Sequence, residues 1–380
     1  MVFLQRCEDY DKNTVLACVR ALFAAHGGIE RYARPGLRVV IKPNLVAKRK
    51  PEAAATTHPA IVWAVAKLCT EQGADVTIAE SPGGLYEKGI LKSLYKVCGI
   101  EAAAEEAGAR LNFDISETEV ENPEAMYLKK IKLITPVAEA DTVINLAKLK
   151  THGMMVYTGA VKNMFGCVAG LEKAEYHLNM SNYDDFANCI IDICLAAKPA
   201  LQIIDAVVGM EKDGPTAGDP VRLGLLLSGD NPFHTDMMAL QIIQAAYQRV
   251  PILRSAAARG LCPSDWREIP YAGPALEAVR APHFKVKYND DMQRIHFVDG
   301  FFGDVLSKMI RPKPVFSGRK CRSCGECVKC CPAKVIALKK GSGAKVTDLS
   351  RCIRCYCCQE LCPFRAVKIK KPVLNKLFIR

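Results

Sequence analysis

Eight cysteines near the C-terminal end of the chain repeat one spacing twice. Each copy reads Cys-x2-Cys-x2-Cys-x3-Cys-Pro. Thiolates are soft ligands, and a 4Fe-4S cube takes four of them. In two-cluster proteins with this spacing, the fourth cysteine of each run binds the other cube. The spacing therefore predicts two 4Fe-4S clusters, the first held by Cys321, Cys324, Cys327 and Cys362 and the second by Cys352, Cys355, Cys358 and Cys331.

A zinc site is the main alternative for these cysteines, because Cys-x2-Cys pairs also bind zinc. The duplication of all four positions, with a proline after each copy, favours iron–sulfur clusters. Cys330 and Cys357 lie inside the runs but outside the repeated positions, and we interpret them as bystanders.

Charge is spread unevenly along the 380 residues, whose formal net charge is +12. Residues 311–380 hold 18 Lys and Arg against three acidic residues, whereas the rest of the chain is slightly acidic. A basic cluster-bearing segment is suited to an acidic electron donor, such as a ferredoxin or a flavodoxin. A basic face also suits nucleic acid, which we do not expect here, or is simply solvated.

The composition indicates a globular protein, since half of the residues are hydrophobic and the chain is long enough to bury a large core. No run of about 18 apolar residues predicts a membrane span. The N-terminal residues lack the pattern of a secretory signal. Eighteen cysteines without an export signal indicate a reducing compartment, so we expect a cytoplasmic protein.

Strand-like apolar runs alternate with helical patterns over the first 300 residues. Strands are predicted at 37–41, 74–79, 109–115, 141–147, 200–208 and 221–228, and helices at 14–23, 58–71, 89–107 and 184–197. This alternation predicts an α/β fold with a mostly parallel, doubly wound sheet. Residues 127–135 fit an antiparallel edge strand. The predicted domains are an α/β body at 1–310 and a small α+β ferredoxin-like domain at 311–380.

Polar side chains follow two of the predicted strands. One strand runs into Lys42 and Asn44, and another runs into Lys148, Lys150 and His152. In open α/β sheets, ligands bind beyond the carboxyl ends of the strands. Alternation with period two also places the last three of these side chains on one face. We therefore expect a polar site at this edge of the sheet.

A short helix is predicted to begin at Thr158, as its cap, and to end at Gly166. Its backbone N–H groups would add donors for an anion. Together with the strand ends it predicts a cationic pocket for a carboxylate- or phosphate-bearing substrate. The predicted proton donors are Lys148, Lys150 and His152, and the predicted substrate-binding residues are Lys42, Asn44, Lys162 and Asn163. The alternative is that these lysines are solvated loop residues.

Two glycine-containing loops follow strands and are candidates to close the same site. Ser81 to Gly84 fits an anion-binding nest, and the other loop spans residues 209–218. Neither loop matches the dinucleotide or P-loop patterns, so the sequence supports no nicotinamide, ATP or flavin site. His177 follows the helical segment and is a further candidate ligand.

These motifs resemble those of a known family, the uncharacterised iron–sulfur-centre proteins grouped as domain of unknown function 362. The resemblance rests on Lys42-Pro43-Asn44, Thr56-Thr57-His58-Pro59, Asn145 to His152, Thr158 to Gly166, Gly209 to Pro215 and the cysteine runs. It covers most of residues 36–240 and the last 60 residues. Lys212 and Asp213 depart from the small or polar residues that the resemblance implies there. The family as a whole implies no particular reaction.

Three functions fit these observations. The first is an iron–sulfur oxidoreductase whose clusters pass low-potential electrons to a small anionic organic substrate, in a reduction or a reductive cleavage. The second is a non-catalytic electron-transfer subunit that docks to a larger oxidoreductase. The third is an iron–sulfur or metal delivery factor, for which Cys167, Cys330 and Cys357 are candidate residues.

Overall fold

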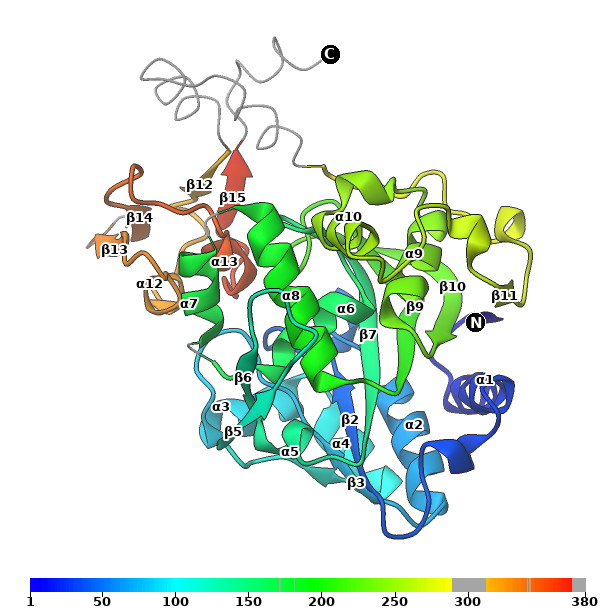
Figure 1. Cartoon of the computed structure of the whole chain (residues 1–380). Helices are drawn as coiled ribbons and strands as arrows, with labels where there is room; N and C mark the ends of the chain where they lie inside the picture. The colour runs from blue at the N-terminus through cyan, green and yellow to red at the C-terminus, as the bar shows by residue number, and fades with distance from the viewer. Residues whose placement is uncertain (171, 181, 289–311, 340, 342, 371–380) are drawn as a thin grey trace.

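The computed structural model describes all residues except 171, 181, 289–311, 340, 342 and 371–380. A nine-stranded sheet lies at its centre (Figure 1). Its strands are β1 (Val2–Arg6), β2 (Arg38–Pro43), β3 (Asp75–Ile78), β4 (Arg110–Leu111), β7 (Thr142–His152), β8 (Val156–Thr158), β9 (Leu201–Glu211), β10 (Asp219–Gly229) and β11 (Tyr271–Ala272). Their order is β11-β1-β10-β9-β7-β2-β3-β4, and β8 pairs with β7.

Five neighbouring strands, from β9 to β4, run parallel, whereas β10 runs antiparallel to β9. Every residue of β7 is buried, as expected for a strand that is covered on both faces. The covering helices are α1 (Lys12–Ala25), α2 (Pro59–Glu71), α3 (Lys88–Val97) and α4 (Ile100–Ala107) on one face, and α6 (Ala160–Asn163), α8 (Tyr183–Ala197), α9 (Pro232–Ile242) and α10 (Pro251–Ala258) on the other. The predicted α/β class, with a mostly parallel and doubly wound sheet, is confirmed.

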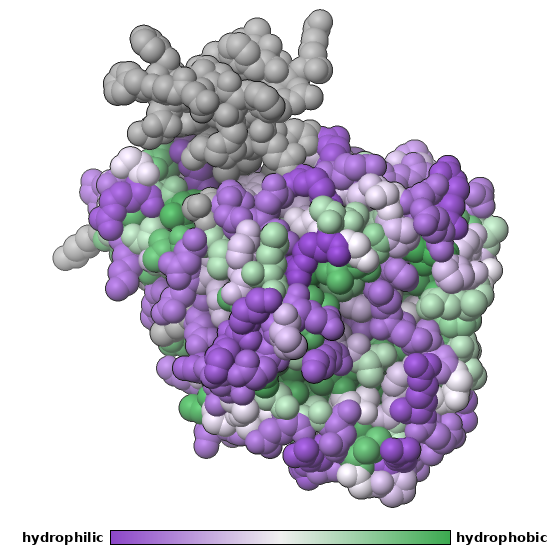
Figure 2. Space-filling model, in the orientation of Figure 1, coloured by the Kyte–Doolittle hydropathy of each residue, from purple (hydrophilic) through white to green (hydrophobic). Residues whose placement is uncertain are grey.

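The remaining short elements surround this core. The helices are α5 (Thr135–Ala138), α7 (Glu172–Asn179) and the 3-10 turns η1 (Ile29–Arg31), η2 (Pro51–Ala53), η3 (Met164–Cys167), η4 (Tyr247–Arg249), η5 (Trp266–Glu268) and η6 (Leu276–Ala278). Among the described residues, no helix combines the length and the apolar character needed to cross a bilayer. Hydrophilic side chains cover much of the face drawn in Figure 2, with apolar residues showing between them.

Four details differ from the sequence-based expectation. The strand β1 was not predicted. The expected helix over 89–107 divides into α3 and α4, because Gly99 adopts a left-handed φ of 74°. The strand expected at 109–115 is only β4. Residues 127–135 contain β6 (Lys130–Ile134), which pairs with β5 (Glu117–Glu121) in a separate two-stranded sheet rather than at the edge of the main one.

The cysteine module, residues 312–370, consists of two short antiparallel strand pairs and two single-turn helices. Its elements are β12 (Lys313–Phe316) with β15 (Val367–Lys370), β13 (Ile336–Lys339) with β14 (Gly343–Val346), α12 (Glu326–Lys329) and α13 (Cys357–Glu360). The duplication extends to the backbone. Positive φ angles at Ser323, Gly325 and Lys334 recur 31 residues later at Arg354, Tyr356 and Arg365. The predicted domain boundary at residue 310 lies outside the described residues.

Tyr356 fixes the cysteine module to the α/β body, residues 1–288. Its φ of 64° is left-handed, and the equivalent residue in the other half of the module is Gly325, with a φ of 82°. A left-handed backbone costs a non-glycine residue about 1–3 kcal/mol. The side chain offsets this cost by packing. It is 3% exposed, belongs to a core formed mainly by the body, and lies close against the backbone of Gly153.

We predict that Tyr356→Ala loosens the docking of the module, because it removes a buried ring and keeps the unfavourable backbone. The expected loss is about 3 kcal/mol of unfolding free energy, measured as a lower urea midpoint for the loss of cluster absorbance. Tyr356→Phe is the matched control and should lose only about 1 kcal/mol, because it keeps the ring and removes only the hydroxyl that donates to Pro312 O at 3.4 Å. Equal midpoints for the alanine variant and the wild type would contradict the anchoring role.

Candidate functional site

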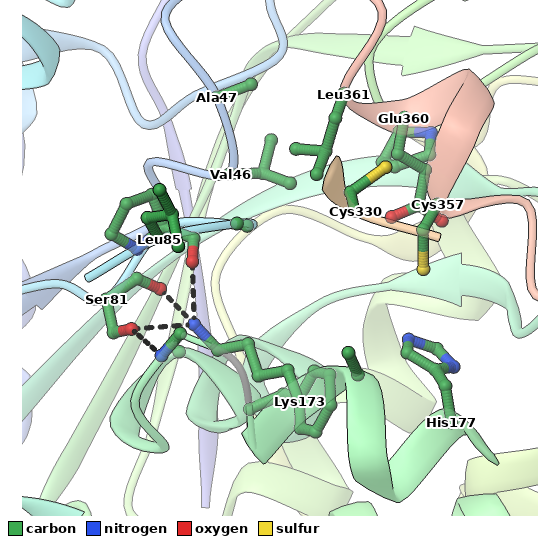
Figure 3. Close-up of a pocket in the computed structure, with 18 of the residues that line it drawn as sticks. Val46, Ala47, Ser81, Leu85, Lys173, His177, Cys330, Cys357, Glu360 and Leu361 are labelled. Atoms are coloured by element: carbon green, nitrogen blue, oxygen red, sulfur yellow. Dashed lines mark hydrogen bonds between the residues drawn. The ribbon is translucent and has the colours of Figure 1, made fainter. Parts of the chain in front are cut away.

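A cavity of about 620 Å³ lies between the α/β body and the cysteine module. On the body side it is lined by the carboxyl ends of β2 and β7, the loop 81–84, α6 and α7. On the module side it is lined by Cys330 to Pro332, Cys357, Glu360 and Leu361. Figure 3 shows side chains from both parts facing this space. Six of the seven residues predicted for the pocket line it: Lys42, Asn44, Lys150, His152, Lys162 and Asn163.

Lys148, the seventh predicted residue, is not part of the cavity lining. Its ammonium lies 2.8 Å from Asp205 Oδ2 and donates to Tyr10 Oη at 2.9 Å. Both Lys148 and Asp205 are buried, and their pairing holds β7 against β9. The prediction that Lys148 would share a pocket with Lys150 and His152 is therefore wrong, because an acidic partner on the neighbouring strand takes up its charge.

A network of buried polar groups forms the floor of the cavity. Lys42 Nζ donates to Pro43 O and Glu80 Oε2, both at 2.9 Å, and to Asn163 Oδ1 at 3.1 Å. Asn44 Nδ2 donates to the same amide oxygen at 2.8 Å. All three N–H groups of the lysine are thus used. Buried networks of this kind are rigid when their members are satisfied, so Lys42, Asn44 and Asn163 position the floor.

Lys150 extends this network and also changes charge near neutral pH. Its ammonium donates to Asn44 Oδ1 and to Ala55 O, both at 2.6 Å. Burial, with a further contribution from the charge of Lys162, lowers the pKa of Lys150 to about 7. A lysine with this pKa exchanges protons readily at neutral pH, as a general acid must.

Lys162 lines the cavity and has no hydrogen-bond acceptor among the described residues. Its Nζ lies 5.1 Å from the centre of the Phe165 ring. Burial lowers the pKa of Lys162, and the nearby carboxylate of Glu360 acts in the opposite direction. An ammonium without an acceptor in a partly closed site is suited to bind an anionic group.

His152 connects the body to the module through Glu360. Its Nδ1 accepts hydrogen bonds from the backbone N–H groups of Met154 at 3.0 Å and Met155 at 3.1 Å, so the ring proton is assigned to Nε2. Nε2 lies 3.1 Å from Glu360 Oε1. These two atoms are close enough for an ion pair but are not aligned for a hydrogen bond. Glu360 Oε1 has no hydrogen-bond partner among the described residues. Burial keeps the pKa of His152 well below its usual value, so the ring is neutral.

The loop 81–84 does not form the predicted anion nest. The ammonium of Lys173, on α7, donates to Ser81 O, to Ser81 Oγ at 2.9 Å and to Pro82 O at 2.9 Å (Figure 3). The loop therefore presents carbonyl oxygens to a cation. Burial lowers the pKa of Lys173 to about 7. This lysine closes the cavity wall and has no N–H group left for a ligand.

The predicted cap at Thr158 is also wrong. Thr158 ends β8, and Gly159 precedes α6 without a side-chain cap of its own. The carboxylate of Asp236, from α9, accepts the N–H groups of Ala160 at 2.7 Å and Val161 at 3.0 Å. The N-terminus of α6 is thus occupied by a protein carboxylate and offers no site for a substrate anion.

His177 lines the cavity from α7, as Figure 3 shows. Its ring stacks on Phe186 with 4.2 Å between centroids, and burial lowers its pKa to about 3. It is therefore a neutral wall residue. The lining residues that the sequence reasoning missed include Glu80, Lys173 and Glu360. The position of Glu80 just after a predicted strand was a usable signal, whereas the other two depend on tertiary packing.

The four cysteines assigned to the first cluster surround one small cavity within the module: Cys321, Cys324, Cys327 and Cys362. Backbone N–H groups point to two of these sulfurs, from Ala344 at 3.4 Å and from Ala366 at 3.2 Å. Hydrogen bonds of this kind stabilise thiolates that bind a cluster. Among the described residues, no group of His, Cys, Asp or Glu is arranged to hold a single metal ion.

The second set of cysteines is also clustered. Burial and then the neighbouring Cys355, Cys330, Cys352 and Cys331 raise the pKa of Cys358, which places these thiols close together. Cys331 also lines the large cavity. The donor set fits a thiolate-bound cluster, and one of its members faces the candidate site directly.

Comparison with known proteins agrees with this organisation. A model of the domain of unknown function DUF362 matches residues 39–241, and a 4Fe-4S dicluster domain matches residues 313–363. The chain belongs to the DUF362 family and carries an iron–sulfur domain of the kind that transfers electrons. It is 31% identical over 268 residues to the thylakoid-associated protein sll1697 of Synechocystis sp., which covers 69% of this chain and 80% of the relative.

Two solved structures are similar over about half of their own length. The lactate racemase apoprotein of Thermoanaerobacterium thermosaccharolyticum shares 12% identity, with a TM-score of 0.35 over 60% of this chain and 54% of the racemase. A protein of Thermotoga maritima shares 8% identity, with a TM-score of 0.32 over 57% of this chain and 55% of that protein. Both TM-scores are below 0.5, and no inference about function rests on them.

We predict that Gly166→Ala disrupts the floor of the cavity. A Cβ atom at this position would lie 2.0 Å from Glu80 Oε1 and 2.6 Å from Lys42 Nζ, which forces the buried pair apart. Breaking such a pair costs about 3–5 kcal/mol, visible as a lower urea midpoint. Gly89→Ala is the control, since nothing lies within 4 Å of its Cβ position. A wild-type midpoint for Gly166→Ala would show that the floor is not constrained in this way.

The cluster assignment predicts iron contents that distinguish neighbouring cysteines. Anaerobically purified protein should contain about eight iron atoms. Cys331→Ala should lose the second cluster and retain about four, because it removes an assigned thiolate. Cys330→Ala should retain about eight. Equal iron loss in both variants, or zinc in stoichiometric amount in the wild type, would contradict the assignment.

Proposed function

We propose that the protein is an iron–sulfur oxidoreductase that reduces an anionic organic substrate in the cavity between the α/β body and the cysteine module. One observation carries this proposal: the same cavity is lined by Lys150 and Lys162 from the body and by Cys331 from the module. An anion held by these lysines would share the cavity with a residue that we assign to the second cluster.

The proposed cofactors are two 4Fe-4S clusters, with the ligands predicted from the cysteine spacing. When bound, they supply electrons one at a time at low potential. The first set includes Cys324, which is exposed, whereas the second set includes Cys331 in the cavity wall. This arrangement supports entry of electrons at the outer set and their use at the inner one.

The surface around the outer set supports an acidic electron donor. Arg319, Lys320 and Arg322 are exposed beside Cys321 and Cys324. Positive charge at such a site speeds the encounter with an acidic partner, such as a ferredoxin or flavodoxin. We place this exchange in the cytoplasm, where thiols remain reduced.

In the proposed reaction, five residues of the cavity have one of three roles: binding of the anion, donation of a proton, or positioning. Lys162 binds the anionic group, and Lys150 donates a proton to the reduced substrate. Reduction of one double bond consumes two electrons and two protons, and reductive cleavage of one bond has the same requirement. Solvent supplies the second proton and then reprotonates Lys150. Lys42, Asn44 and Asn163 are positioning residues, because their polar groups are occupied by one another.

The test is a single-turnover measurement under anaerobic conditions. Fully reduced protein is mixed with individual organic acids, cluster reoxidation is followed by absorbance, and the product is identified by mass spectrometry. We expect at least one acid to reoxidise the wild type and to be slowed at least tenfold by Lys162→Gln. Lys67→Gln, on the surface of α2 and paired with Glu71, is the control.

A uniform failure of organic acids, together with rapid reoxidation by a protein acceptor, would overturn the proposal. That outcome would favour the non-catalytic electron-transfer subunit instead.

The pKa of Lys150 sets a predicted pH dependence. A lysine donates its proton only while protonated, so the pKa of about 7 predicts a reduction rate that is level below pH 7. Above that pH the rate should fall by about tenfold per unit. Lys150→Arg should be slower at all pH values and should lose the decline, since arginine stays charged. An unchanged decline in this variant would assign the titration to another group.

A further inference from the structure

The cavity has an apolar wall that the proposed function does not explain. Val46, Ala47, Leu85 and Leu361 lie near one another on one side of the cavity in Figure 3. Further apolar side chains of the lining include Ile90 and Leu94 from α3 and Leu178 from α7. Such a surface favours an apolar ligand, because covering it removes apolar area from water.

The module supplies part of this wall through Leu361. A Cβ atom built on Gly83 would lie 2.7 Å from Leu361 Cδ2, so this side chain is inserted directly against the loop 81–84. Arg49 holds the same segment by donating to Cys362 O at 2.7 Å. The docking of the module therefore completes the apolar wall by adding Leu361 to it.

Four lysines of the lining are not exposed, and one of these four is left for a ligand. Lys42 and Lys173 each have three acceptors, and Lys150 has two. Lys162 has none among the described residues and lies near Glu360 and Cys357, whose charges act on its pKa. This pattern suits one anionic group rather than a substrate that is charged along its length.

We propose that the substrate is an amphipathic organic acid, with one carboxylate or similar anionic group bound at Lys162 and an apolar body against Val46, Leu85 and Leu361. This inference rests on the proposed function and specifies the chemical class of the substrate. The volume of about 620 Å³ lies within the range of pockets that bury a drug-sized ligand. Lys162 and Cys331 line the same cavity, so we place the reducible group of the substrate next to its acid group.

The test is isothermal titration of the oxidised, cluster-loaded protein with three probes: 2-naphthoate, acetate and 2-naphthalenemethanol. The first has both an apolar body and an anionic group, and each of the others lacks one of them. We expect 2-naphthoate to bind at least tenfold more tightly than either. Lys162→Gln should reduce its affinity to that of the alcohol, and Leu85→Ala should weaken it about tenfold. Ile115→Ala, an exposed apolar residue outside the lining, is the control.

Acetate that binds as tightly as 2-naphthoate would overturn the proposal, as would a Leu85→Ala variant with wild-type affinity. These measurements use oxidised protein and require no electron transfer. A failure here therefore concerns the substrate class alone, whereas a failure of reoxidation by acids that do bind concerns the proposed reaction.

Discussion

The docking of the cysteine module onto the carboxyl ends of β2 and β7 is the constraint on which the rest of the site depends. The module contributes the ring of Tyr356 to a core built mainly by the body. Polar contacts fix its orientation, since Thr216 Oγ1 donates to Glu360 O at 2.7 Å and His152 approaches the carboxylate of the same residue. Without this docking, the strand ends would face solvent, the apolar wall would lack Leu361, and the wall formed by the module would be missing.

Charge neutralisation inside the body decides which basic residues remain for chemistry. A buried ammonium is costly unless it is paired or hydrogen-bonded. Lys148 meets Asp205, Lys42 meets Glu80, and Lys173 meets carbonyl oxygens. These lysines stabilise the architecture, whereas Lys150 and Lys162 retain unused hydrogen-bonding capacity next to the module. Of these five lysines, Lys150 and Lys162 are therefore the two candidates for a role in binding or catalysis.

The sequence predicted the α/β sheet and six of the residues that line the cavity, because ligands bind beyond the carboxyl ends of the strands in such sheets. It failed where the outcome depended on distant partners. Asp205 removes Lys148 from the site, and Asp236 occupies the N-terminus of α6. The cysteine spacing allows a prediction of the metal ligands but gives no sign that the module closes a cavity, since Glu360 carries no motif of its own. Packing between distant segments cannot be read from local patterns.

The proposed organic acid binds next to the second cluster, and electron–nuclear double resonance measures this proximity directly. The reduced protein would be mixed with 2-naphthoate that carries ¹³C in its carboxylate. We predict a ¹³C hyperfine coupling to the paramagnetic cluster that is present in the wild type and absent in Lys162→Gln. Saturated binding of the acid without any such coupling would contradict the account, because it would place the ligand away from the cluster.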